Sequence, residues 1–339
     1  MAAPAGTTQT FQMTGVREQL ADAIINIAPM DTPLFSTIKK GTAQSRTPEW
    51  LRDTLANPNP VNITIEGNDP TNLTAVDPDR IKNVMQLMDK TLQVSSSAQA
   101  VKAAGRSNEL KYQVAKRGQE IKRDIEMRIA GNYSSVTGNA TTGGEMAGYE
   151  AWMVTNVSRG ATGVSGGYSS GTGLTTKATD GTTRPFTEAL LKSTIQTCWN
   201  NGADISLIML TGAHKQQASA FTGIATQYRD SNANSMKQTT ILGAAGVYIS
   251  DFGEHKLIAN RFIGAGTGRT LDATTGLALG ASVRSALLVD PSKWKIAFLQ
   301  PFTTVPLAKT GHADRRMLFA ELTLECLEER GSGIIADLT

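Results

Sequence analysis

The feature that most constrains this chain is an extended segment followed by a long amphipathic helix. Residues 47–93 are rich in Pro and Asn and carry only short alternating apolar pieces, such as Val61, Ile63 and Ile65. This pattern is typical of a long β-hairpin or extended loop without a core of its own. We expect one helix to follow over residues 97–132. The extended segment and the helix make up about a quarter of the chain. Residues used in this way favour a protein that contacts copies of itself over an enzyme, which would use them to line a pocket.

One face of the expected helix is apolar and packs against other parts of the protein, and the rest of its surface is exposed to solvent. It would be about 50 Å long at 1.5 Å per residue, although Gly105 and Gly118 each weaken it by up to ~1 kcal/mol. Charged residues surround the rest of the axis, and the apolar stripe consists of Leu110, Val114, Ile121, Ile125 and Ile129.

Residues 186–290 read as a second packed unit with alternating helices and strands. Helices are expected at 186–199 and 213–226, and strands at 205–210, 247–250, 255–259 and 286–289. The preceding residues, 133–185, are rich in Gly, Ser and Thr and predict a connector with one strand at 151–157.

The chain ends in strands, and the last one alternates clearly. Over residues 316–328, apolar side chains such as Leu322 point to one face, while Glu321, Thr323 and Glu325 point to the other. We expect the apolar face to pack under the long helix, and the glutamates to face solvent or a neighbouring subunit.

Composition excludes several classes of protein. The content of hydrophobic residues is 40%, which is enough for a sizeable core. The net charge of +3, from 33 basic and 30 acidic residues, is too balanced for a protein that condenses nucleic acid. No apolar run approaches the ~18 residues of a membrane span. Cys198 and Cys326 lie among apolar neighbours and are expected to be buried thiols rather than a disulfide.

No motif predicts catalysis, a cofactor or a metal site. His214, His255 and His312 lack partners at the spacing that metal sites use. The Gly-rich string GAGTGRT at 264–270 superficially resembles a phosphate loop, but it has the wrong spacing and no helix pattern follows it. We therefore expect a flexible loop tip there, and no enzyme.

Four strings resemble a known family. They are DTPLFSTIKKGTAQSRTPEWLRDTLA (31–56), FTEALLKSTIQTCW (186–199), FTGIATQYRD (221–230) and PFTTVPLAKTGHADRRMLFAELTLE (301–325). With these strings the chain resembles tailed-bacteriophage major capsid proteins of the Hong Kong 97 fold, in the same order over roughly residues 14–339. The stretches 134–185 and 262–282 match poorly.

The resemblance implies an α+β fold and a part for each segment. Residues 1–41 would be an N-terminal arm, 42–94 an extended E-loop lying over a neighbouring subunit, and 95–185 a peripheral domain with a spine helix. Residues 186–290 would form the axial domain, and 291–339 the C-terminal strands of the peripheral domain. No catalytic residue is implied, and a covalent Lys–Asn link known in some members cannot be mapped onto this chain.

The resemblance also implies partners and a location in the virion capsid, with assembly in the host cytoplasm. The subunit would form pentamers and hexamers with copies of itself in an icosahedral or prolate head, and contact a portal protein, a decoration protein and packaged double-stranded DNA without sequence preference. Because only about thirty residues precede the first matching string, we expect a separate scaffolding protein or none. Residues expected at the assembly interface are Arg46, Glu49, Trp50, Arg52, Lys116, Arg123, Arg315, Arg316, Glu321 and Glu325.

Two alternatives remain at this point. One is an encapsulin-like shell of a cellular nanocompartment, which would enclose a cargo enzyme instead of DNA. The other is a hydrolase or nucleotide-binding enzyme built on residues 186–289. For the capsid hypothesis we expect Trp50→Ala, or deletion of residues 54–82, to leave the subunit soluble but to block closed shells.

Overall fold

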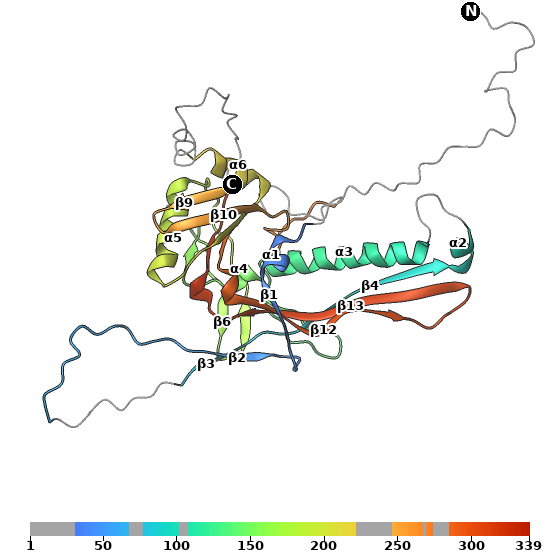
Figure 1. Cartoon of the computed structure of the whole chain (residues 1–339), viewed down its shortest axis with the longest axis horizontal. Helices are drawn as coiled ribbons and strands as arrows, with labels where there is room; N and C mark the ends of the chain where they lie inside the picture. Colours follow the sequence, from blue (N-terminus) through green and yellow to red (C-terminus); the bar gives the residue numbers. More distant parts are fainter. Residues whose placement is uncertain (1–30, 68–76, 102–107, 222–245, 267–268, 274–284) are drawn as a thin grey trace, which may run out of the picture.

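The computed structural model describes residues 31–67, 77–101, 108–221, 246–266, 269–273 and 285–339 (Figure 1). The helices are α1 (Pro33–Thr37), α2 (Ser96–Ala100), α3 (Glu109–Ala130), α4 (Tyr149–Trp152), α5 (Glu188–Asn200) and α6 (Gly212–Ser219), with 3-10 turns at Pro291–Lys293 and Glu329–Gly331. The strands are β1 (Lys39–Thr42), β2 (Glu49–Arg52), β3 (Asp79–Lys82), β4 (Gln86–Ser95), β5 (Val157–Ser158), β6 (Gly167–Ser169), β7 (Leu174–Thr176), β8 (Leu207–Leu210), β9 (Val247–Ser250), β10 (Gly253–Ala259), β11 (Ala286–Val289), β12 (Trp294–Pro306), β13 (Ala313–Cys326) and β14 (Gly333–Ile335).

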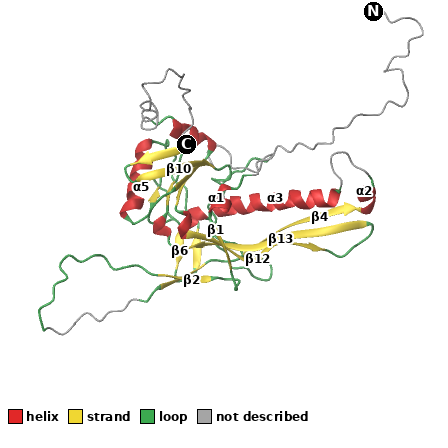
Figure 2. Ribbon diagram, in the orientation of Figure 1, coloured by secondary structure: helices red, strands yellow, loops and turns green. Residues whose placement is uncertain are grey.

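A long four-stranded sheet supports helix α3. Its strand order is β1-β12-β13-β4, and only the β1–β12 pair is parallel. Helix α3 runs alongside β4 and β13 in Figure 2, and its Ile121, Ile125 and Ile129 share one buried core with Leu318 and Leu322 of β13. The expectation that the last long strand packs under the helix is therefore confirmed.

The expected continuous helix over 97–132 is wrong in its first third. Helix α2 ends at Ala100, Val101 has extended φ and ψ, and α3 begins after Asn108. The side chain of Asn108 accepts a hydrogen bond from the backbone N–H of Lys111, which is the bond of an N-cap, and so a new helix starts there. The rod of 22 residues is about 33 Å long instead of about 50 Å.

A six-stranded sheet lies between two hydrophobic cores. Its order is β5-β14-β11-β8-β10-β9. All four residues of β8 are buried, because Leu207 and Met209 face the core shared with α3 while Ile208 and Leu210 face the core under α5 and α6. A short, wholly apolar run is what a strand covered on both faces requires. The expected strands 205–210, 247–250 and 286–289 and the helix 186–199 are confirmed in this unit.

The predicted domain boundaries at residues 185 and 290 do not separate the two sheets. The six-stranded sheet takes β5 from the segment 95–185 and β14 from the segment 291–339, and pairs both with strands of the segment 186–290. The division into peripheral and axial parts therefore stays a prediction. The second half of the helix expected at 213–226 lies outside the described residues beyond Phe221.

The strand expected at 151–157 is wrong. Tyr149, Ala151 and Trp152 lie in helix α4 and are buried, and strand β5 covers only Val157–Ser158. Helix α4 packs its aromatic residues inward: the Tyr149 ring lies 4.5 Å from the Trp294 ring, and its hydroxyl donates to the carbonyl of Leu288 at 2.8 Å. Aromatic residues favour strands locally, but here burial on a short helix decides their conformation.

Strands β2 and β3 form the expected hairpin within residues 42–94. They pair antiparallel from Glu49↔Lys82 to Arg52↔Asp79, and residues 53–78 connect them. The hairpin and the described part of its loop extend away from the body of the molecule at the lower left of Figure 1. The next strand, β4, leaves the hairpin and enters the long sheet as an edge strand.

Candidate assembly surfaces

The loop between β2 and β3 carries apolar side chains that the described residues of this chain leave exposed. Leu55 is 99% exposed, Ile63 82%, Ile65 77% and Val61 69%. Val61, Ile63 and Ile65 alternate along the chain, so that in an extended conformation they share one side. Apolar residues gathered on one exposed segment are typical of a surface that binds another molecule.

The base of this loop is held firmly by its own subunit. Indole Nε1 of Trp50 donates to the carbonyl of Cys326 at 2.9 Å, and the Trp50 ring lies 6.0 Å from the ring of Trp152. Two ion pairs cross the hairpin, Glu49 with Arg80 and Arg52 with Asp79 at 3.3 Å. Trp50, expected at an intersubunit contact, is thus half-buried against the core of its own chain.

The face of the long sheet opposite α3 has a partly exposed apolar row. By the strand register, Leu87 and Phe319 lie on the side away from the helix, and so do Met317 and its partner Val305. Leu87 is 60% exposed, and the other three are half-buried. Charged and polar residues, including Asp89 and Arg315, border this row. Partly exposed apolar residues interspersed with charged and polar ones are found at many protein interfaces.

The other expected interface residues are spread over the molecule. Arg46 and Lys116 are exposed. Arg123 of α3 lies over the ring of Phe262, with its guanidinium carbon 5.9 Å from the ring centre. Arg315 Nε donates to Gln93 Oε1 at 3.0 Å across the strand pair. Arg316 and Glu321 are half-buried on β13.

The expectation that Glu325 faces outward freely is wrong. It is 6% exposed, and its carboxylate pairs with Lys295 Nζ of β12 at 2.9 Å. On the same side of β13, Thr323 is fully buried and its hydroxyl donates to the carbonyl of Val84 at 2.9 Å. This end of the sheet is covered on both faces by the subunit itself, which strand alternation alone does not reveal.

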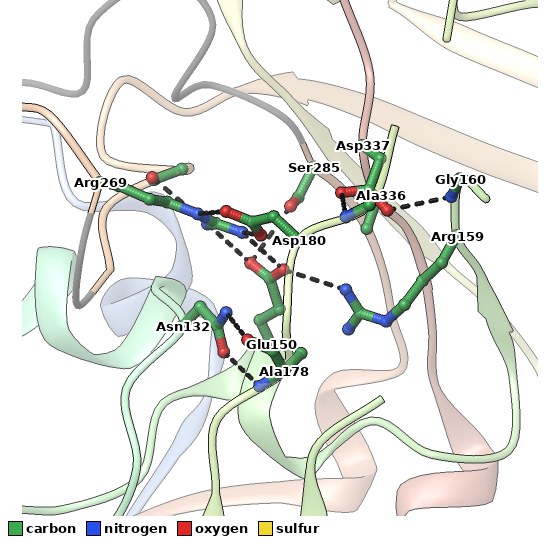
Figure 3. Close-up of polar contacts among 12 residues, drawn as sticks. Asn132, Glu150, Arg159, Gly160, Ala178, Asp180, Arg269, Ser285, Ala336 and Asp337 are labelled. Carbon is green, nitrogen blue, oxygen red and sulfur yellow. Dashed lines mark hydrogen bonds and ion pairs between the residues drawn. The ribbon is translucent and has the colours of Figure 1, made fainter. Parts of the chain in front are cut away.

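The Gly-rich string at 264–270 contributes a buried ion-pair network rather than a phosphate loop. Arg269 turns inward and makes bidentate contacts with Glu150, at 2.9 and 3.0 Å, and with Asp180, at 2.6 and 3.2 Å (Figure 3). Ser285 Oγ donates to Glu150 at 3.1 Å, and Arg159 lies 3.6 Å from the same carboxylate. Burial disfavours the charged guanidinium, but the two carboxylates outweigh it and raise the pKa of Arg269 above its usual value. No signal in the sequence distinguished this arginine from a solvated one.

The remaining candidates for chemistry have ordinary structural contacts. His255 is buried, with Nδ1 2.6 Å from the carbonyl oxygen of Ile205, and His214 lies 3.0 Å from the hydroxyl of Thr211. Cys198 and Cys326 are buried free thiols, as expected, and burial raises the pKa of Cys198 to about 12. In the ranges that the structure describes, no group of three His, Cys, Asp or Glu side chains could hold a metal ion. No described helix has the length and apolar character to cross a bilayer.

The architecture is that of a Hong Kong 97-type capsid protein. The fold resembles a solved structure from Gordonia phage Cozz with a TM-score of 0.56 at 11% identity, covering 99% of this chain and 97% of that one. It also resembles the capsid of a native GTA particle, with a TM-score of 0.57 at 9% identity and 96% coverage of both chains. These similarities establish the α+β fold that the sequence strings implied.

The chain belongs to the SU10 major capsid protein family, whose model matches residues 3–339. A major capsid protein from Escherichia phage Phieco32 is 34% identical over 118 residues, a segment that spans 34% of this chain and 33% of that relative. The protein is therefore a structural subunit of a virion capsid. The family match places it with phage capsid proteins rather than with the encapsulin-like alternative.

Proposed function

We propose that this capsid subunit assembles with copies of itself, as pentamers and hexamers, into a closed icosahedral or prolate head around double-stranded DNA. The observation that carries the proposal is the loop at 53–67, whose apolar side chains are exposed while its base is fixed by Trp50. A shell repeats the same heterologous contact around its symmetry axes, so each subunit must offer one surface and accept another.

In this proposal residues 42–94 act as the E-loop and bind a neighbouring copy. The alternating side chains of Val61, Ile63 and Ile65 would cover the apolar row around Leu87 and Phe319 on the next subunit. Burial of apolar surface contributes about 25 cal/mol per Å², from which the cost of ordering the loop must be subtracted. A single contact is then weak, and a closed shell is stable because each contact occurs in every subunit.

The other segments take the roles that the family implies. Helix α3 serves as the spine helix, residues 1–41 as the N-terminal arm, and residues 186–290 as the axial domain at the five-fold and six-fold centres. The subunit acts as a structural protein without catalytic activity. Portal, scaffolding and decoration proteins remain proposed partners, as does packaged DNA.

The hairpin geometry gives a sharp test of the loop. Deleting residues 54–82 would remove strand β3, so the better variant replaces residues 53–78 with Asn-Gly. The last ladder pair, Arg52↔Asp79, would then be closed by a two-residue turn of the type that suits hairpins. We expect a folded subunit with the circular dichroism and melting temperature of the wild type, and no closed particles by electron microscopy.

The wild-type chain, expressed and purified in parallel, is the control for particle formation. A variant that still forms closed particles of normal size would refute the role proposed for the loop. The contents of wild-type particles provide a separate check, because encapsulated DNA agrees with a phage head and an encapsulated enzyme would agree with a nanocompartment.

A further inference from the structure

Glu126 of helix α3 is a fully buried acid that joins three parts of the subunit. Its Oε1 accepts a hydrogen bond from the backbone N–H of Leu34 at 2.9 Å and another from Asn260 Nδ2 at 2.7 Å. Its Oε2 accepts from the backbone N–H of Phe35 at 2.7 Å. Leu34 and Phe35 belong to α1, and Asn260 follows strand β10 of the six-stranded sheet.

Helix α1 depends on this carboxylate for its N-terminal cap. The residue at its N-cap position, Thr32, makes no capping bond with its side chain, and Pro33 has no N–H to donate. Without Glu126, the backbone amides of Leu34 and Phe35 would be buried without an acceptor, which would destabilise the docked helix. An acid on another helix, 91 and 92 residues away in sequence, supplies both acceptors.

We propose that Glu126 is a proton-linked clasp, whose protonation state sets how tightly α1 and the strand after it are held on α3. The ionised carboxylate offers two acceptor oxygens to three donors. The neutral acid must place its own proton near one of these donors, but it escapes the cost of a buried charge. Docking and protonation of this group are therefore coupled. This inference concerns the single subunit and does not depend on the proposed assembly contacts.

Two opposing effects on Glu126, burial and hydrogen bonding, decide whether α1 docks more tightly at low or at high pH. Burial raises the pKa of Glu126 from 4.5 to about 7, although the bonds from Phe35, Leu34 and Asn260 act against it. With α1 released, water reaches the carboxyl and its pKa falls back toward the ordinary value. Because the docked state has the higher pKa, docking takes up a proton. The docking is strongest below pH 4.5 and weakens as the pH rises through about 7.

The charged residues near Glu126 belong to α3, to the segment before α1 and to the segment after β10. On α3, Lys122 and Arg123 lie one turn before Glu126, and the guanidinium of Arg123 lies over the ring of Phe262 rather than beside the carboxylate. Asp31 before α1 and Arg261 beside Asn260 are exposed. Across the residues that the structure describes, no ion pair joins any of these side chains to Glu126.

Packing keeps α1 in place when the clasp weakens, so the effect is a change in opening rather than unfolding. The buried ring of Phe35 lies 6.4 Å from that of Phe298 and 6.3 Å from that of Phe302. Lys40 Nζ also donates to the carbonyl of Phe35 at 3.1 Å, and β1 continues as a ladder partner of β12.

Hydrogen exchange of the full chain tests the clasp. Exchange of the peptide that covers residues 33–42 is measured by mass spectrometry at pH 6 and pH 8.5 for the wild type and for Glu126→Gln. Dividing the wild-type exchange rate by that of Glu126→Gln at each pH removes the intrinsic pH dependence of exchange. With pKa values of 4.5 and about 7 for the released and docked acid, the ratio of wild-type to variant opening should rise about tenfold between the two pH values.

Glu120→Gln is the matched control, because Glu120 lies on the same helix but pairs with Arg117. We expect its ratio to the wild type to be independent of pH. If Glu126→Gln fails to fold, Asn260→Ala keeps the carboxyl and removes one donor, so the pH midpoint of opening should move upward. A ratio for Glu126→Gln that is equal at both pH values, or an unmoved midpoint for Asn260→Ala, would overturn the proposal.

Discussion

Strand β13 and the loop segment 61–65 have the same alternation of apolar and polar residues, but opposite environments. In β13, Leu318, Ala320 and Leu322 are buried under α3. In the loop, Val61, Ile63 and Ile65 are 69–82% exposed. The difference shows that alternation predicts which side of a segment will be covered, and not whether the cover comes from the same chain. An apolar stripe that the described residues of its own subunit leave exposed is typical of a surface that binds another molecule.

The largest loss of stability is expected from breaking the buried ion-pair network of Arg269, Glu150 and Asp180. Arg269→Met leaves Glu150 fully buried with its bidentate partner removed. We expect a loss of about 3–5 kcal/mol in the free energy of unfolding, measured by denaturant titration of the unassembled subunit. Arg261→Met is the control, because Arg261 is exposed on the same stretch of chain. Equal losses for both variants would contradict a structural role for the network.

A matched pair of isoleucines tests the comparison directly. Ile125→Ala opens a cavity in the core beneath α3 and should reduce the free energy of unfolding by about 2–5 kcal/mol. Ile63→Ala removes the same atoms from the exposed loop and should change it by less than about 0.5 kcal/mol. Ile63→Ala should nevertheless lower the yield of particles, because it impairs the assembly of a subunit that is itself stable. A large loss of stability for Ile63→Ala would mean that the loop is covered by its own chain.

The junction between the two regions should give a smaller loss of stability than Arg269→Met or Ile125→Ala. Trp50→Ala removes a hydrogen bond to Cys326 and the contact with Trp152, and we expect a loss of about 1–3 kcal/mol. Leu51→Ala, which is 68% exposed beside it, should change stability by less than about 0.5 kcal/mol. Thermal melting of the two variants measures the difference. If Trp50→Ala matches Leu51→Ala in stability and still blocks shells, the residue acts between subunits after all.

The sequence predicted elements whose signals are local. Strand β11 and helix α5 were predicted because a short apolar run and helical hydrophobic periodicity are local patterns. The break before α3 was missed, although Asn108 is a good N-cap residue, because Gly105 was expected to weaken the helix without ending it. Residues 151 and 152 were read as a strand because local propensity cannot show that Trp152 packs between Trp50 and Tyr168.

Long-range polar contacts were beyond prediction from the sequence. Glu126 and Arg269 look like ordinary surface charges, since the groups that bury them come from segments distant in sequence. The loop with Val61 and Ile63 could be identified because its apolar residues stand out among prolines and asparagines. The sheet face proposed as its docking surface could be identified only from the strand register, which the structure supplies.

The order of synthesis gives the strand topology a further consequence. Strand β14, which lies between β5 and β11, is synthesised after both of its partners, and β1 pairs with the much later β12. Neither sheet can close while the nascent chain is still short of these residues, and sheets with such distant pairings form slowly. The loop between β2 and β3 would therefore leave the ribosome long before its own subunit has completed either sheet. In the proposed assembly, a nascent chain can therefore expose its own loop before it offers a folded surface to another subunit.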